Sequence, residues 1–193
     1  MCKTAEQIKE LSVLCERVLA DKQITATLDQ VTTTIINAYK TGNKTIFCGN
    51  GGSAAEAQHL AAELSGKFNF ERRPIPAEAC HVNSSFVTAV SNDYDFTQVY
   101  SRHIDGFGCK GDILIGLSTS GTSENIVNAF KTAQTKGLTT VALTGKTGGA
   151  LDALSDFIIK VPSENVPRIQ EIHLLLGHII CEKVEKALFG DEH

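Results

Sequence analysis

Three segments of the chain share one pattern: KTGNKTIFCGNGGSAAE (40–56), CKGDILIGLSTSGTSEN (109–125) and TKGLTTVALTGKTGGAL (135–151). In each segment a lysine and a glycine end one element, a short apolar strand follows, and a loop of glycine, serine or threonine comes next. The first two loops lead into stretches with helical spacing at 54–66 and 123–136. Repeated strand, loop and helix is typical of a parallel sheet with helices packed on its faces.

The same reasoning predicts the elements around these segments. Apolar residues at helical spacing indicate two helices in the first forty residues. The apolar positions of the first lie between Ile8 and Leu19, and the second runs over about 25–40 and is ended by Gly42. The rest of the chain predicts strands at 76–82 and 157–161 and helices at 85–92, 96–106 and 166–188. We therefore expect a single α/β domain over residues 1–193: an N-terminal helical pair at 1–42 and, at 43–190, a flavodoxin-like parallel sheet of about five strands flanked by helices.

Composition and charge exclude several classes of protein. The 193 residues are 42% hydrophobic and carry 18 basic against 22 acidic side chains, a net charge of −4, which argues against a dedicated nucleic-acid binder. The apolar stretch at 174–180 is short and contains His178, so it does not predict a membrane span. The N-terminal residues show no apolar signal segment, and the six cysteines form no Cys-x-x-Cys motif. We expect a cytoplasmic protein with reduced thiols that binds neither nucleic acid nor a membrane.

The loop at 118–123, Ser-Thr-Ser-Gly-Thr-Ser, stands between a predicted strand and a predicted helix. Its five hydroxyl groups lie at the amino end of that helix, where backbone N–H groups lack partners and the helix dipole is positive. This combination suits a phosphate monoester. The alternative is a serine- and threonine-rich turn in which one hydroxyl, such as that of Ser123, caps the helix.

The loop at 49–54, Gly-Asn-Gly-Gly-Ser-Ala, fits the G-x-G-x-x-A pattern of dinucleotide-binding folds. That pattern also requires an acidic residue at the end of the second strand, whereas Glu78 lies at the start of the predicted one. We therefore interpret the glycines as residues that let the backbone approach a sugar phosphate closely. A third loop, at 144–147, resembles a P-loop but has Thr140 where that motif requires glycine, which argues against ATP hydrolysis.

Residues able to do acid–base or metal chemistry lie on two predicted helices. His59 and Glu63 share one helix face, where they can hold a divalent metal or act as acid and base; the alternative is an exposed ion pair. On the last helix His178 lies within LLLGHII, where a core histidine is the alternative. Gln170 is separated from His178 by about 12 Å of helix rise and about 80° of rotation. Two such side chains do not easily reach one ion. Either the long glutamine side chain compensates for this distance, or the two residues come from different subunits, and we favour a site shared between subunits as a hypothesis.

Asn92 and Asp93 form another polar pair. They come after a short predicted helix, near a loop at the end of a strand. The alternative for this pair is an ordinary turn, in which both residue types are common.

Five motifs together resemble the sugar-isomerase (SIS) domain family: CGNGGSAAEAQHLAAEL (48–64), SNDYDF (91–96), GDILIGLSTSGTSEN (111–125), VALTGKTGG (141–149) and RIQEIHLLLGH (168–178). The resemblance covers nearly the full length. The loop of serine and threonine marks the wider family, whereas its combination with His-x-x-x-Glu and RIQEIH is similar to the phosphoheptose isomerases within it. Those enzymes convert D-sedoheptulose 7-phosphate to D-glycero-D-manno-heptose 7-phosphate, the first step of nucleotide-activated heptose biosynthesis.

The resemblance implies a role for each matching residue. Glu63 and His178 would be the acid–base pair of a ketose–aldose isomerisation through an enediol. One zinc ion per site would be held by His59, Glu63, Gln170 and His178. The sugar phosphate would contact Asn50, Gly51, Gly52, Ser53, Glu63, Asn92, Asp93, Ser118, Thr119, Ser120, Ser123 and Gln170. The resemblance also implies a homotetramer with active sites between its subunits.

One position departs from the family pattern, and other members of the family offer alternative functions. Some members carry an aspartate where this chain has Pro167, so that substrate contact is not carried over; proline there predicts the start of the last helix. The main alternative is a non-catalytic SIS protein, an oligomeric scaffold that binds the replication initiator. That group lacks the carboxylate and the last-helix histidine that stand here as Glu63 and His178. Arabinose-5-phosphate isomerases carry additional domains, and a sugar-phosphate sensor needs an appended DNA-binding segment.

Overall fold

The parallel sheet that the three segments predict is present in the computed structural model, which describes residues 3–190. Its strands lie in the order β2-β1-β3-β4-β5, all parallel. They are β1 (Thr45–Gly49), β2 (Ala77–Ala79), β3 (Ile113–Ser118), β4 (Thr139–Thr144) and β5 (Phe157–Lys160). This is the strand order of flavodoxin-like folds, so the predicted fold class is confirmed.

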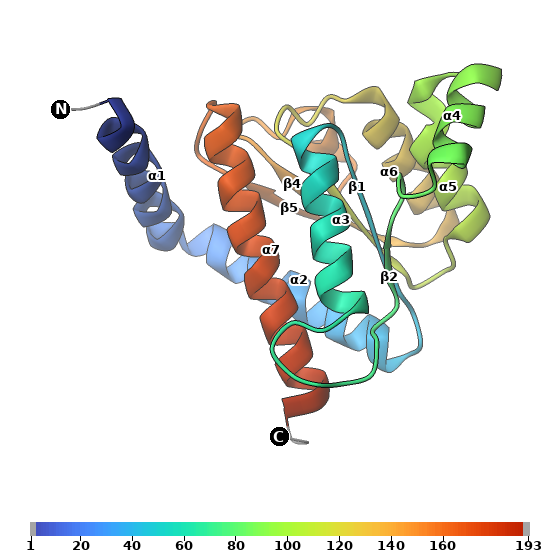
Figure 1. Cartoon of the computed structure of the whole chain (residues 1–193), viewed down its shortest axis with the longest axis horizontal. Coiled ribbons are helices and arrows are strands. Elements are labelled where there is room, and N and C mark those ends of the chain that lie inside the picture. Colours follow the sequence, from blue (N-terminus) through green and yellow to red (C-terminus); the bar gives the residue numbers. More distant parts are fainter. Residues whose placement is uncertain (1–2, 191–193) are drawn as a thin grey trace.

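Helices cover both faces of the sheet. One face carries α1 (Lys3–Ala20), α2 (Lys22–Lys40), α3 (Gly52–Ser65) and α7 (Val166–Phe189). The other carries α4 (Ser84–Asp93), α5 (Val99–Phe107) and α6 (Glu124–Lys136), with short 3₁₀ segments at Phe96–Gln98 and Gly149–Ala153. Figure 1 shows α3 and α7 side by side in front of the sheet, with α4 and α5 at its far end.

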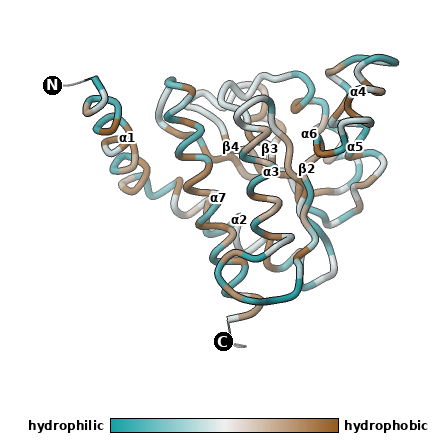
Figure 2. Tube along the Cα trace, viewed as in Figure 1, coloured by the Kyte–Doolittle hydropathy of each residue, from teal (hydrophilic) through white to brown (hydrophobic). Residues whose placement is uncertain are grey.

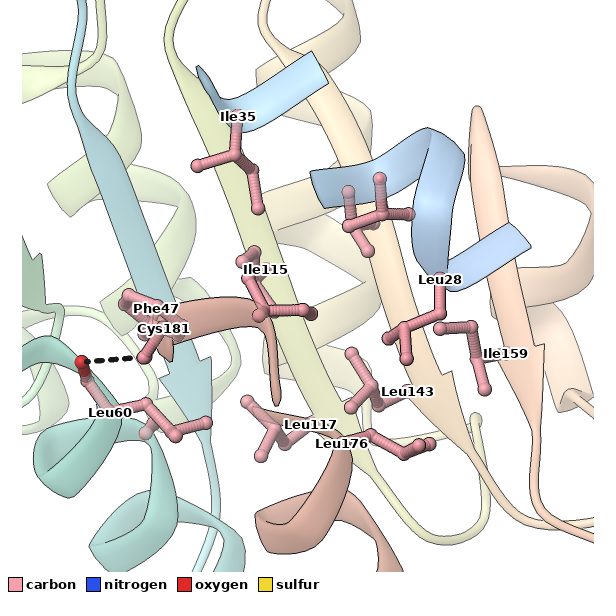
Figure 3. Packing of buried hydrophobic residues seen from close by; sticks show 14 of the residues in the cluster. Leu28, Ile35, Phe47, Leu60, Ile115, Leu117, Leu143, Ile159, Leu176 and Cys181 are labelled. Atoms are coloured by element: carbon pink, nitrogen blue, oxygen red, sulfur yellow. Dashed lines mark hydrogen bonds between the residues drawn. The ribbon is translucent and has the colours of Figure 1, made fainter. Parts of the chain in front are cut away.

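The core has two layers because successive strand residues point to opposite faces. Phe47, Ile115 and Leu143 point toward α2, α3 and α7, where Figure 3 shows them close to the helix residues of the same cluster. Their neighbours Leu114 and Ala142 pack under α5 and α6. In Figure 2 the hydrophobic residues accordingly gather along the sheet and the helix sides that face it.

The element boundaries differ most from the predicted ones in three places. The strand predicted at 76–82 is only Ala77–Ala79, because it is an edge strand with β1 as its single neighbour and the chain then turns toward α4. The second helix begins at Lys22 rather than 25, because the Asp21 carboxylate accepts hydrogen bonds from the N–H groups at its start. The helix predicted at 96–106 is a 3₁₀ turn followed by α5.

The N-terminal helices pack on α7 and the sheet. Leu28, Val31 and Ile35 of α2 are buried in the same cluster as the strands. On α1 only Leu14 and Val18 are buried, whereas Ile8 and Leu19 of the predicted apolar stripe are 67% and 78% exposed. Within residues 3–190, no helix combines the length and apolar character that crossing a membrane requires.

Candidate functional site

A pocket of about 170 Å³ opens at the edge of the sheet where β1 and β3 end, and we call it the Ser/Thr pocket. The loops that follow parallel strands meet at this edge, which is where ligands bind in such folds. It holds six of the predicted substrate residues beside three apolar ones. Its lining consists of Asn50, Ser53, Leu117, Ser118, Thr119, Ser123, Ile126, Val166 and Gln170.

The hydroxyls of the 118–123 loop divide into two groups. The Ser118 and Ser120 hydroxyls accept hydrogen bonds from the backbone N–H groups of Gly121 and Thr122, at 3.1 and 3.2 Å, and so shape the loop. Ser123 is the N-cap residue of α6, yet within residues 3–190 its side chain makes no capping hydrogen bond. A simple helix cap therefore does not explain this residue, which lines the pocket beside the positive end of α6. Ser120 is exposed and lines a neighbouring hollow with Lys146.

Gly121 allows the loops of two sequence motifs, at 118–123 and 145–149, to pack against each other. It has φ +67°, and a Cβ at this position would lie 2.0 Å from the carbonyl oxygen of Gly148. Only glycine lets the 118–123 loop approach the 145–149 loop so closely. The second loop therefore supports the first from behind.

Asn50 is held by a residue to which the sequence analysis assigned no role. Its Nδ2 donates to Oδ1 of Asn125 at 2.9 Å, and Nδ2 of Asn125 donates back to Oδ1 of Asn50 at 2.8 Å. Asn125 is only 3% exposed, so this paired amide joins the loop after β1 to the start of α6. Asn125 lies in the 111–125 motif, but nothing in its spacing pointed to Asn50.

The structure brings three of the predicted metal or catalytic residues together, and we call them the acid–base cluster: His59, Glu63 and His178. Nε2 of His59 lies 3.2 Å from Oε1 of Glu63, one turn away on α3. It also lies 2.8 Å from Nε2 of His178 on α7, with the two rings at 65°. His178 is thus no core histidine, and all three residues meet within one chain.

Close packing of α3 against α7 makes this meeting possible. Gly177 lies beside Leu60, and a Cβ on Gly177 would come within 2.5 Å of that side chain. The Leu60 carbonyl also accepts a weak hydrogen bond from the Cys181 thiol at 3.9 Å, drawn in Figure 3. The helices can approach there because the residue next to His178 has no side chain.

Gln170 lies at the other end of the same helix pair. Its Nε2 donates to the Ser53 hydroxyl at 3.3 Å, and a Cβ on Gly52 would lie 2.6 Å from that nitrogen. The structure therefore places Gln170 in the Ser/Thr pocket, about 12 Å of helix rise from His178. Its membership of a metal site stays a prediction.

The acid–base cluster fits a divalent cation by the chemistry of its donors. Two imidazole nitrogens and one carboxylate oxygen lie within 4.8 Å of one another. Two histidines and a glutamate are a common ligand set of catalytic zinc, with a further position open. The three residues could accordingly hold Zn²⁺.

Asn92, Asp93 and Glu56 lie outside the Ser/Thr pocket and the acid–base cluster. Asn92 and Asp93 form the last turn of α4 instead of following it; both are exposed, and Asn92 donates to Asp93 at 2.8 Å. They are not among the residues that line the Ser/Thr pocket in the described part of the chain. Glu56, one turn before His59 on α3, is not among the predicted site residues. Burial raises the pKa of Glu56 to about 7, and its Oε2 has no hydrogen-bond partner within residues 3–190.

Comparison with known proteins agrees with this arrangement. The family model of the SIS domain matches residues 7–145. The phosphoheptose isomerase of Clostridium acetobutylicum is 47% identical over 186 residues, covering 96% of this chain and 95% of its own. The enzyme of that name from Mycobacterium tuberculosis is 46% identical, with 98% of each chain covered.

Solved structures agree as well. A phosphoheptose isomerase from Francisella tularensis superposes with a TM-score of 0.91 at 32% identity, covering 95% of this chain and 97% of that one. The one from Neisseria gonorrhoeae reaches 0.89 at 34% identity, with the same coverage. The chain therefore belongs to the SIS domain family and, within it, to the phosphoheptose isomerases.

Proposed function

We propose that this protein converts D-sedoheptulose 7-phosphate to D-glycero-D-manno-heptose 7-phosphate, with Glu63 and His178 as the acid–base pair. The observation that carries the proposal is the position of both clusters on α3. The Ser/Thr pocket lies at its amino end with Ser53, and the acid–base cluster lies further along with His59 and Glu63. The helix rises by about 9 Å between Ser53 and His59, on the order of the length of an open-chain heptose.

The Ser/Thr pocket would bind the phosphate end. Ser123 and Thr119 offer hydroxyl donors beside the amino end of α6, whose positive end favours a dianion. Asn50, held by Asn125, and Gln170, which donates to Ser53, would contact the hydroxyls of the sugar. Binding the unreacting end in this way orients C1 and C2 toward α3 and α7.

The reaction moves one proton between two carbons and one between two oxygens. Glu63 would take a proton from C1 as the electron pair of that C–H bond forms the C1–C2 double bond and the carbonyl π electrons pass to O2. His178 would give a proton to O2 and accept the one that leaves O1. Return of the first proton from Glu63 to C2 forms the aldose, so both residues end in their starting state.

His59, Glu63, Gln170 and His178 remain the proposed ligands of one Zn²⁺ ion. When bound, the ion supplies positive charge that polarises the carbonyl and stabilises negative charge on the substrate oxygens. Glu63 has two carboxylate oxygens, which allows it to serve both as ligand and as base. Nε2 of His59 also lies within hydrogen-bond distance of both catalytic residues. With Zn²⁺ bound, the three side chains would be held by the ion in place of these contacts.

The proposal extends to assembly and setting. We propose a cytoplasmic homotetramer that performs the first step of nucleotide-activated heptose biosynthesis. The acid–base cluster is complete within one chain, so a neighbouring subunit would contribute to the substrate end. Asn92 and Asp93, exposed on α4, are the residues we propose for that contribution.

The test is turnover of sedoheptulose 7-phosphate by the purified protein, followed by NMR of the aldose product. Glu63→Gln should lower kcat by about a hundredfold or more, because it removes the base without changing the shape of the side chain. The matched control is Glu182→Gln, an exposed carboxylate on α7, which should leave kcat unchanged. Chelation should lower the activity and Zn²⁺ should restore it.

The outcomes separate the parts of this proposal. Absence of turnover by the wild-type protein contradicts the proposed reaction as a whole. Full activity of Glu63→Gln contradicts the assignment of the base. Activity that survives chelation contradicts only the role of zinc.

A further inference from the structure

The Glu185 carboxylate is buried two turns beyond His178 on α7, and no sequence motif assigns a role to it. The Glu185 side chain is fully buried and accepts hydrogen bonds from three consecutive backbone N–H groups, those of Phe68, Asn69 and Phe70, at 2.8, 2.6 and 3.2 Å. These residues belong to the 66–72 turn, which is the first part of the connection from α3 to β2. It lies in the hydrophilic loop at the bottom of Figure 2. Burial favours a higher pKa for Glu185, but these hydrogen bonds outweigh it and the pKa is lowered, so the group is ionised.

The counter-ion of Glu185 is Arg72, whose side chain is equally buried. Its Nε donates to Glu185 Oε1 at 2.7 Å. Its Nη2 donates to the carbonyl oxygen of Glu63 at 2.9 Å, and its Nη1 donates to those of Leu64 and Gly66, both at 3.0 Å. These carbonyls lie at the carboxyl end of α3, where helical partners are missing. The guanidinium group therefore holds the main chain of the catalytic glutamate.

The same turn reaches the catalytic histidine. The ring centroid of Phe68 lies 5.8 Å from that of His178, with the planes tilted by 46°. Because the Phe68 N–H is bound to Glu185, the position of this ring is set from the same helix that carries His178. Both members of the proposed acid–base pair are thus connected to one buried ion pair.

We infer that Arg72 and Glu185 are positioning residues for the isomerisation: through the 66–72 turn they hold the Phe68 ring against His178 and the backbone of Glu63 at the end of α3. Buried ion pairs contribute little net stability compared with apolar residues. The Arg72–Glu185 pair is therefore better explained by the position in which it holds the 66–72 turn than by the stability it adds. The inference rests on the proposed function in so far as His178 and Glu63 carry out the chemistry.

The Phe68 ring provides the kinetic test. Phe68→Leu keeps an apolar side chain but removes the ring, and should lower kcat by about tenfold while KM changes by less than about twofold, because Phe68 is outside the Ser/Thr pocket. Phe68→Tyr keeps the ring and should restore most of kcat. The matched control is Phe86→Leu, since Phe86 also lies 5.8 Å from a histidine ring, that of His103, on the other face of the sheet. Its kcat should remain that of the wild type.

A spectroscopic test addresses the ion pair directly and does not depend on turnover. Arg72→Lys keeps the charge but loses the planar fork that reaches Glu185 and the Glu63 carbonyl together. The imidazole proton signals of His178 should therefore shift in Arg72→Lys as they do in Phe68→Leu, because in both the aromatic ring leaves the histidine. They should not shift in Phe86→Leu.

Two results overturn the inference. One is a wild-type kcat in Phe68→Leu, or an equal loss in Phe68→Leu and Phe86→Leu. The other is an unchanged His178 signal in a folded Arg72→Lys protein; if Arg72→Lys does not fold, the Phe68 variants decide. Failure of the proposed function is distinguishable, because wild-type protein would then not turn over the heptose while the His178 signals still report on the ion pair.

Discussion

His173 and His178 differ by little more than one turn on α7, yet they have opposite environments. His178 lies in the acid–base cluster, whereas His173 is fully buried and its Nε2 lies 3.2 Å from the carbonyl oxygen of Thr144. Burial lowers the pKa of His173 to about 4, because the folded interior disfavours the imidazolium form, and the hydrogen bond only partly offsets this. Its Nδ1 has no hydrogen-bond partner within residues 3–190, so His173 is a buried core histidine with one of its two ring nitrogens bonded.

This pKa predicts an acid-sensitive fold. Unfolding restores the ordinary pKa of about 6.5, so between pH 6.5 and 4 the unfolded chain binds more protons than the folded one. The free energy of unfolding should be constant above about pH 6.5 and should fall by about 3 kcal/mol toward pH 4 from this residue alone. Denaturant titrations across this range measure it. His173→Gln should flatten the slope even if it lowers the plateau; an identical slope in both proteins would refute the assignment.

At the scale of elements, the loop after β3 depends on a backbone that only glycine allows. Gly121 combines φ +67° with a backbone neighbour 2.0 Å from any added Cβ. Gly121→Ala should lower stability by about 2 kcal/mol or more and raise KM strongly, because the loop must leave the 145–149 loop and deform the Ser/Thr pocket. Gly42→Ala is the matched control, since Gly42 also has positive φ, at +84°, but nothing lies within 4 Å of its Cβ position. Thermal unfolding and KM are the measurements, and equal effects of the two changes would disprove the role of the loop contact.

Elements that repeat a strong local signal could be predicted from the sequence. The strand–loop–helix segments around Thr45–Gly49 and Ile113–Ser118 combine an apolar run with a glycine-containing loop, and both strands are found where expected. The edge strand is shorter than predicted because the chain turns after Ala79, where the Val82 N–H donates to the Ala79 carbonyl oxygen, although residues 80–82 are as apolar as the strand before them. On α1, helical spacing could not distinguish the buried Leu14 from the exposed Leu19, since both follow the same period.

The residues of the candidate site could be proposed from the sequence, but the contacts that join them across the fold could not. His59 and Glu63 are close in sequence, so their contact follows from helix geometry alone. The contact of His59 with His178 joins two helices and depends on Gly177, which no local rule links to Leu60. Asn125, Arg72 and Glu185 were missed for the same reason, because their partners are distant in the chain. Tertiary packing decides such pairs, and a single sequence holds no direct record of it.

At the scale of the whole molecule, some residues of the proposed site lie together within one chain and others lie apart from them. The acid–base cluster and the Ser/Thr pocket share α3 and α7 of one subunit, while Asn92 and Asp93 stand apart on α4, at the opposite side of Figure 1 from α1. The hypothesis of a site between subunits arose from the distance between Gln170 and His178, and we extend it to Asn92 and Asp93. A site that takes Asp93 from a neighbouring subunit and a site whose acid–base cluster is divided between subunits predict different activities for mixed oligomers.

Mixing inactive variants distinguishes which residues act within a subunit and which act across an interface. If Asp93 serves a neighbouring site, Glu63→Gln and Asp93→Ala subunits, unfolded and refolded together in equal amounts, should regain about a quarter of the wild-type activity, because only sites with an intact cluster from one subunit and Asp93 from the other are complete. Glu63→Gln mixed with His178→Asn should regain none, since both residues must come from the same chain. Activity in the second mixture would show that the cluster is shared between subunits after all. Absence of activity from both mixtures would show that Asp93 acts within its own subunit or not at all, and Asp93 would then give the proposed tetramer no catalytic role.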